Sequence, residues 1–204
     1  MENFAPHGPE YFLGEGEFSR RDSVIREAVE ELMTYRVGYD FTGDRAKVEK
    51  VRMFFRRKFG KPEYIFGGRK GRERTASDVI REGYFVNCID FALVFSTLVR
   101  EVGIPAKYVE TFVPGKLARG KFKIHGFVDL FVEGEWKSYS PGEGFTYHNG
   151  VYFFGGDVYK KLAEGLDFSE LYFPGGEGPA GVYTREGLER RARALLETAR
   201  PKFF

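Results

Sequence analysis

The sequence predicts a single-domain α+β fold, in which helices and strands occupy separate stretches of the chain. Residues 19–102 place apolar side chains at three- and four-residue steps, which is the period of a helix. From residue 106 to about 154 the period changes towards two, as in strands. No internal repeat or low-complexity linker divides the 204 residues. We therefore expect one domain in which the helices and the sheet form separate layers.

The first half of the chain predicts four helices. Residues that cap helix starts precede two of them: Asp22 or Ser23 the first, and Thr75 or Ser77 the third. The fourth ends at Gly103, and glycine is common at helix ends. It is apolar on nearly every side, so we expect it at the centre of the fold, covered by other layers. The expected ranges are 19–35, 44–59, 78–82 and 88–102.

The second half predicts strands and then two helices. Glu133-Gly134 is expected to turn between two strands, and Asn149-Gly150 between aromatic residues is typical of a tight hairpin. The expected strands are 106–113, 122–132, 135–140, 145–147 and 151–154. Helices are expected near 157–165 and over 184–199, and residues 1–20, rich in glycine and proline, are expected as an extended arm lying on the body.

Composition excludes several classes of protein. With 42% hydrophobic and 30% charged residues, the chain is not mainly disordered. It has no run of 18 apolar residues, so no membrane span is expected, and its N-terminus lacks the pattern of a signal peptide, which favours a cytoplasmic location. The net charge of +2 does not by itself imply a nucleic-acid partner. The absence of glutamine beside 32 basic and 30 acidic residues is typical of proteins from hot-living organisms.

Cys88, the one cysteine of the sequence, stands at the start of the expected central helix. The free N–H groups and the dipole of a first helical turn lower the pKa of a thiol and favour its nucleophilic thiolate form. His125, 37 residues later on an expected strand, can carry the proton. A thiol at a helix start beside an imidazole on a strand is an arrangement for acyl transfer. The alternative is a small buried cysteine and a core histidine without a catalytic role.

Five short motifs, in order, resemble the transglutaminase-like superfamily, which belongs to the papain-like cysteine-peptidase group. They are NCIDFA at 87–92, LVREVGIPA at 98–106, HGFVDL at 125–130, GEW at 134–136 and SP at 140–141. The resemblance, of the archaeal or thermophilic type, implies a core over about 75–142 in which a buried helix bearing the cysteine packs on an antiparallel sheet. Residues 1–74 then form an N-terminal helical part, and residues 143–204 a C-terminal hairpin and helices, of the same domain.

The same resemblance implies a Cys-His-Asp triad. By position, Cys88 matches the family nucleophile and His125 the family base. The family aspartate stands directly before a proline, where this sequence has Ser140. A serine hydroxyl can orient an imidazole but carries no charge, so we expect slower catalysis, with Ser140 as the orienting group.

Other polar groups stand near the expected site in the sequence. Asp129 lies roughly 13 Å along the strand from His125, out of reach, whereas Glu143 on its glycine-flanked turn stays an alternative acid. With no glutamine for an oxyanion hole, the Cys88 backbone N–H is one donor and Asn87 or Tyr84 the candidate second donor.

The expected function is that of a cofactor-independent thiol enzyme acting on amide bonds of a peptide or isopeptide substrate, by hydrolysis or acyl transfer. The alternative is a weak or inactive relative that binds a peptide or protein partner. No metal or cofactor is expected, because no ligand cluster is seen and the glycine-rich loops lack the Gly-Lys-Ser/Thr of a phosphate cradle. Two basic stretches, 56–74 and 116–123, favour solvated loops over a nucleic-acid surface.

Overall fold

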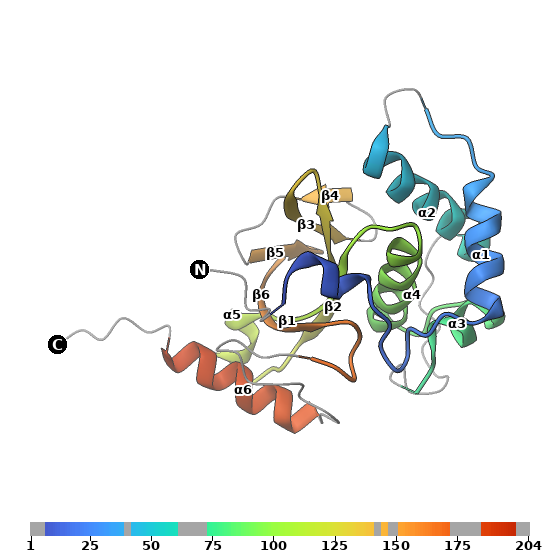
Figure 1. Ribbon diagram of the computed structural model, residues 1–204. Coiled ribbons are helices and arrows are strands. Elements are labelled where there is room, and N and C mark those ends of the chain that lie inside the picture. The colour runs from blue at the N-terminus through green and yellow to red at the C-terminus, as the bar shows by residue number, and fades with distance from the viewer. Residues whose placement is uncertain are drawn as a thin grey trace.

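A six-stranded antiparallel sheet with helices packed against it forms the body of the protein (Figure 1), which confirms the predicted α+β class. The computed structural model describes residues 7–38, 42–60, 73–140, 144–146, 151–171 and 185–198. Across the sheet the strands follow the order β4-β3-β2-β1-β6-β5. Their bounds are Ala106–Phe112 for β1, Ile124–Val132 for β2, Glu135–Ser140 for β3, Gly144–Thr146 for β4, Val151–Phe154 for β5 and Asp157–Gly165 for β6.

The helices begin where the sequence predicted caps. The Asp22 side chain accepts hydrogen bonds from two N–H groups of the first turn of α1, and Thr75 forms a capping box with Asp78 at the start of α3. The bounds are Ser23–Met33 for α1, Gly43–Phe59 for α2, Ala76–Glu82 for α3, Cys88–Glu101 for α4, Pro114–Leu117 for α5 and Arg185–Thr198 for α6.

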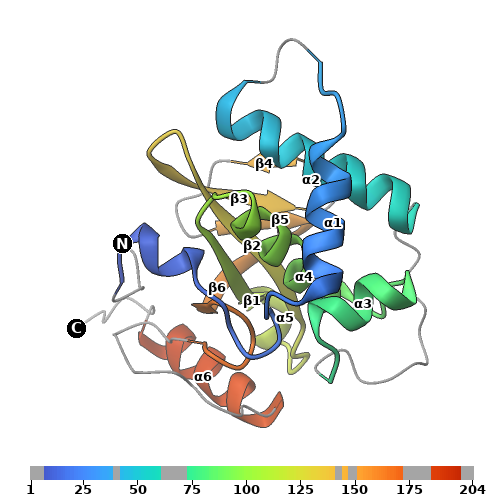
Figure 2. The same cartoon turned by 45° about the vertical axis from the view of Figure 1, so that its right-hand side comes forward.

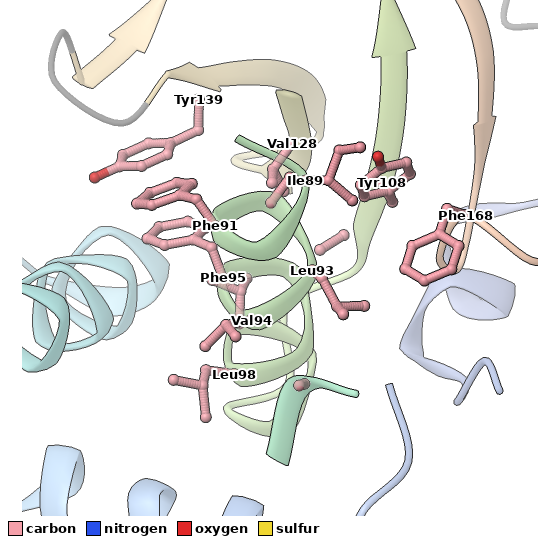
Figure 3. Close-up of a cluster of buried hydrophobic side chains, with 14 of the residues drawn as sticks. Ile89, Phe91, Leu93, Val94, Phe95, Leu98, Tyr108, Val128, Tyr139 and Phe168 are labelled. Atoms are coloured by element: carbon pink, nitrogen blue, oxygen red, sulfur yellow. The ribbon is translucent and has the colours of Figure 1, made fainter. Parts of the chain in front are cut away.

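Helix α4 lies at the centre of the fold, as predicted from its apolar sequence. Every residue from Ile89 to Arg100 is buried. In Figures 1 and 2 the sheet lies on one side of α4, and α1, α2 and α3 cover the other. Figure 3 shows the aromatic contact with β3, where the Tyr139 ring stacks on Phe95 with centroids 4.2 Å apart. Helix α4 is therefore held between two layers.

Two expectations for the C-terminal half were wrong. Residues 157–165 form strand β6, which pairs with β1 and β5, and no helix. The hairpin expected around Asn149-Gly150 would pair β4 with β5, whereas β4 pairs with β3 and β5 pairs with β6, at opposite edges of the sheet. Residues 147–150 themselves lie outside the described part of the chain. The tight turn lies at Gly155-Gly156, where both φ angles are positive (55° and 78°), a conformation that glycine adopts without strain.

The N-terminal arm lies on the body, but it is not wholly extended. Pro9–Leu13 form a short 3-10 helix, η1, whose Phe12 is fully buried. The Phe12 ring meets Trp136 of β3 edge-on at 5.6 Å between centroids. Trp136 thus anchors the arm at the end of β3 far from Ser140.

Candidate active site

Cys88 is the first residue of α4, as the sequence predicted. The side-chain oxygen of Asn87 caps the helix by accepting hydrogen bonds from the N–H groups of Ile89 and Asp90. The Sγ atom of Cys88 in turn accepts a hydrogen bond from the backbone N–H of Gly126, over 3.4 Å. The helix start and this N–H donor both stabilise negative charge on sulfur.

Gly126 allows this approach because it has no side chain. A Cβ atom at this position would lie 3.3 Å from the Cys88 carbonyl oxygen and 3.4 Å from both the Ala92 Cβ and the Tyr108 hydroxyl. The first turn of α4 therefore rests directly on the backbone of β2. The contact lies beyond the register of β2 with β3, which ends at Val128 opposite Tyr139.

His125 precedes Gly126 on β2, so the backbone of the predicted base lies next to the residue that contacts Cys88. Its partner across β1 is Thr111, whose hydroxyl donates a hydrogen bond to the His125 carbonyl. The imidazole is 6% exposed and packs edge-on against Phe127 at 4.8 Å between centroids. Burial, and then the charge of Lys123, lower the pKa of His125 to about 4. At neutral pH the ring is therefore uncharged.

Tyr159 is a member of this cluster that the sequence analysis missed, because it placed the residue in an expected helix. Its ring centroid lies 5.6 Å from that of His125, and its side chain is fully buried. Burial raises the pKa of the Tyr159 hydroxyl, Lys123 opposes the increase, and the charge of Cys88 adds to it. Tyr159 of β6 therefore lies near His125 of β2 and within the electrostatic reach of Cys88 of α4.

Ser140, the predicted orienting residue, is the last residue of β3 and pairs with Gly144. Its side chain and the whole of Glu143 lie outside the described part of the chain. Asp129 is buried and accepts hydrogen bonds from the Tyr152 hydroxyl (3.0 Å) and the Lys161 ammonium (3.3 Å). These contacts agree with its rejection as a partner of His125.

Arg74 contacts the segment that leads into Cys88. The sequence placed it in a basic stretch, 56–74, that was expected to be solvated. It is fully buried, and its guanidinium donates to Asp90 at 2.7 Å and to the Tyr84 carbonyl at 3.0 Å. Asp90 also accepts the N–H of Val86 at 2.7 Å. Burial raises the pKa of Asp90, while the Val86 N–H and the Arg74 charge lower it. The ion pair fixes the segment leading into Cys88.

The second basic stretch is partly neutralised. Lys116 and Lys123 both contact the Asp157 carboxylate at 2.6 Å. Of the first stretch, residues 61–72 lie outside the described residues. Within the described ranges, no group of three or more His, Cys, Asp or Glu side chains is placed to hold a metal ion, and no helix is long and apolar enough to cross a membrane.

Solved structures and one family model are similar to this chain. A structure from Cytophaga hutchinsonii, described as a candidate cysteine protease, is similar with a TM-score of 0.51 and 24% identity over 76% of this chain, which spans 46% of that one. Calcium-bound LapG of Legionella pneumophila gives 0.47 and 16% identity, covering 82% of this chain and 98% of that one. No curated protein matches. The family model of the transglutaminase-like superfamily matches residues 26–141, more than half of the chain. The chain belongs to the transglutaminase-like superfamily.

Proposed function

We propose that the protein is a cofactor-independent thiol enzyme that acts on amide bonds of peptide or isopeptide substrates. The single observation that carries the proposal is the hydrogen bond from the Gly126 N–H to Cys88 Sγ at the start of α4, directly beside His125. In this arrangement Cys88 is the nucleophile and His125 the base. Ser140 orients the imidazole.

The lowered pKa of His125 defines the protonation state of the proposed Cys88–His125 pair. A buried imidazole with a pKa of about 4 is neutral at pH 7, so the resting site holds a neutral base beside the sulfur. His125 accepts the thiol proton as sulfur attacks the carbonyl carbon, and then donates that proton to the leaving amine. Water, or a second amine, then attacks the acyl-thioester with His125 again as base.

Formation of an acyl-thioester tests the proposal. We expect the native protein, mixed with p-nitrophenyl acetate, to gain one acetyl group on Cys88 by intact mass, and His125→Ala to acylate about 10²- to 10⁴-fold more slowly. Cys88→Ala measures acylation of other side chains. Peptide and isopeptide libraries then identify the bond that is cleaved. Equal acylation of the native protein and Cys88→Ala would contradict the proposed enzyme.

A second candidate function is a binding module that has kept the fold and lost the chemistry. The observation in its favour is Ser140, an uncharged residue where the family carries an aspartate. The module would bind peptides with equal affinity in the native and Cys88→Ala proteins and would form no acyl-thioester.

A further inference from the structure

The Tyr159 hydroxyl is a buried polar group beside His125 in the candidate site. Its oxygen is buried and makes no hydrogen bond within the described part of the chain. Lys123, whose ammonium donates a hydrogen bond to Asp157 at 2.6 Å, lowers the pKa of the Tyr159 hydroxyl through a side-chain interaction and through its charge. A buried hydroxyl without a partner costs stability, on the order of 1–3 kcal/mol. Such a group is retained more readily where it serves a ligand.

Tyr152, the neighbour of Tyr159 in the sheet, differs from it in having a hydrogen-bond partner for its hydroxyl. Tyr152 lies opposite Tyr159 in the pairing of β5 with β6, and both belong to one buried apolar cluster on the sheet. The Tyr152 hydroxyl donates to Asp129 at 3.0 Å. Of the two paired tyrosines, the one without a hydrogen bond is the one whose ring lies 5.6 Å from that of His125.

We propose that the Tyr159 hydroxyl is a further catalytic group, which donates a hydrogen bond to the oxyanion formed when Cys88 attacks a carbonyl carbon. This inference rests on the proposed function. The two second donors considered from the sequence have other contacts that orient them: the Asn87 side-chain oxygen accepts the capping hydrogen bonds of α4, and the Tyr84 ring lies against the Arg74 guanidinium at 4.6 Å. The Cys88 N–H is the first donor.

The step balances without any other reactant. The sulfur electron pair forms the C–S bond, the carbonyl π pair moves to oxygen, and His125 takes the thiol proton. Tyr159 keeps its own proton throughout and only shares it with the oxyanion, in keeping with its raised pKa. When the intermediate collapses, the C–N bond breaks, and the proton on His125 goes to the amine.

Two reactions of Cys88 separate this role from a structural one. Acylation by p-nitrophenyl acetate passes through an oxyanion, whereas alkylation by iodoacetamide is a direct displacement at carbon and forms none. We expect Tyr159→Phe to acylate about 10²- to 10³-fold more slowly than the native protein, the usual effect of losing one oxyanion donor. Its alkylation rate should change by less than about threefold, because the thiol and His125 remain.

Tyr152→Phe is the matched control, since it removes one hydroxyl from the same aromatic cluster. We expect native rates in both reactions, with the free energy of unfolding lowered by the lost hydrogen bond to Asp129. Acylation of Tyr159→Phe at the native rate would overturn the role of Tyr159 and leave the proposed enzyme intact. An equal fall in acylation and alkylation would also overturn it, because the defect would lie in the thiol. A native protein that does not acylate at Cys88 contradicts the proposed function itself.

Discussion

The Sγ atom of Cys88 accepts a hydrogen bond from the backbone N–H of Gly126, and this contact joins the central helix to the strand that bears His125. Two features of the sequence make it possible: Asn87 caps α4 so that the helix begins at Cys88, and glycine at position 126 admits the helix to the strand backbone.

Gly126→Ala should loosen the junction. The added Cβ would meet three atoms at 3.3–3.4 Å, so α4 must shift. We expect a loss of about 1–3 kcal/mol in the free energy of unfolding, measured with urea, and slower alkylation of Cys88. Gly115→Ala is the control, because a Cβ there meets nothing within 4 Å. A Gly126→Ala protein with native stability and native thiol reactivity would contradict the close packing described here.

Arg74→Met should destabilise the protein strongly, because it leaves the Asp90 carboxylate buried without its ion-pair partner. We expect a loss of about 3–5 kcal/mol in urea unfolding. Arg81→Met is the control, because it breaks only the exposed ion pair between Arg81 and Asp78 within α3. It should lower the free energy of unfolding by less than about 1 kcal/mol. The double variant Arg74→Met/Asp90→Leu should recover part of the loss. Equal effects of the two single arginine variants would contradict the structural role of Arg74.

The pKa of His125 predicts how stability depends on pH. Its value falls from 6.5 to about 4 on folding, so between these pH values the unfolded chain binds the proton and the folded protein does not. The free energy of unfolding should therefore decrease as pH falls from 6.5 towards 4, by up to about 1.4 kcal/mol per pH unit. Subtracting the profile of His125→Gln isolates this contribution from the carboxylates. A difference that stays constant over this range would mean that the pKa of His125 is not lowered.

Lys123 is the second cause of the lowered pKa of His125 and can be tested separately. Lys123→Met removes its positive charge, so the pKa should rise from about 4 towards 6.5 without reaching it, because the burial remains. Titration of the histidine ring protons by NMR measures the change, with His125→Gln used to assign the signal. Lys121→Met removes an exposed charge two residues away and is the control. An unchanged pKa in Lys123→Met would assign the entire shift to burial.

Local signals in the sequence were enough to predict the helices of the core. Thr75, a predicted cap, stands where α3 begins, and the apolar surface of α4 on all sides predicted its central position. The Glu133-Gly134 turn was also predictable, and its φ angles of 59° and 81° are those of a tight hairpin. Each of these features depends on residues within a few positions of one another.

Strand β6 shows where local signals fail. Residues 157–165 include lysine, leucine, alanine and glutamate, which favour helices in isolation, yet pairing with β1 and β5 on both sides makes them a strand. The tight turn lies at Gly155-Gly156, whereas the sequence analysis predicted it at Asn149-Gly150. Because residues 157–165 were expected to form a helix, Tyr159 was not predicted to lie near the site.

The candidate site was predictable only where its residues lie in short motifs. Cys88 and His125 stand in such motifs, but Arg74 and Tyr159 reach the site through contacts between distant segments, and their types alone do not mark them. The catalytic roles of Cys88, His125 and Ser140, the single-domain organisation, the cytoplasmic location and a thermophilic source stay predictions.

The pH dependence of Cys88 alkylation by iodoacetamide tests the central claim most directly, because the chain has one cysteine and therefore no background thiol. We expect rapid alkylation of the native protein that persists near pH 6, below the free thiol pKa of about 8.5, and a rate at least about tenfold lower in His125→Ala. Slow alkylation that rises only near the free thiol pKa, with the same profile in His125→Ala, would contradict an activated thiol and leave Cys88 as a structural residue.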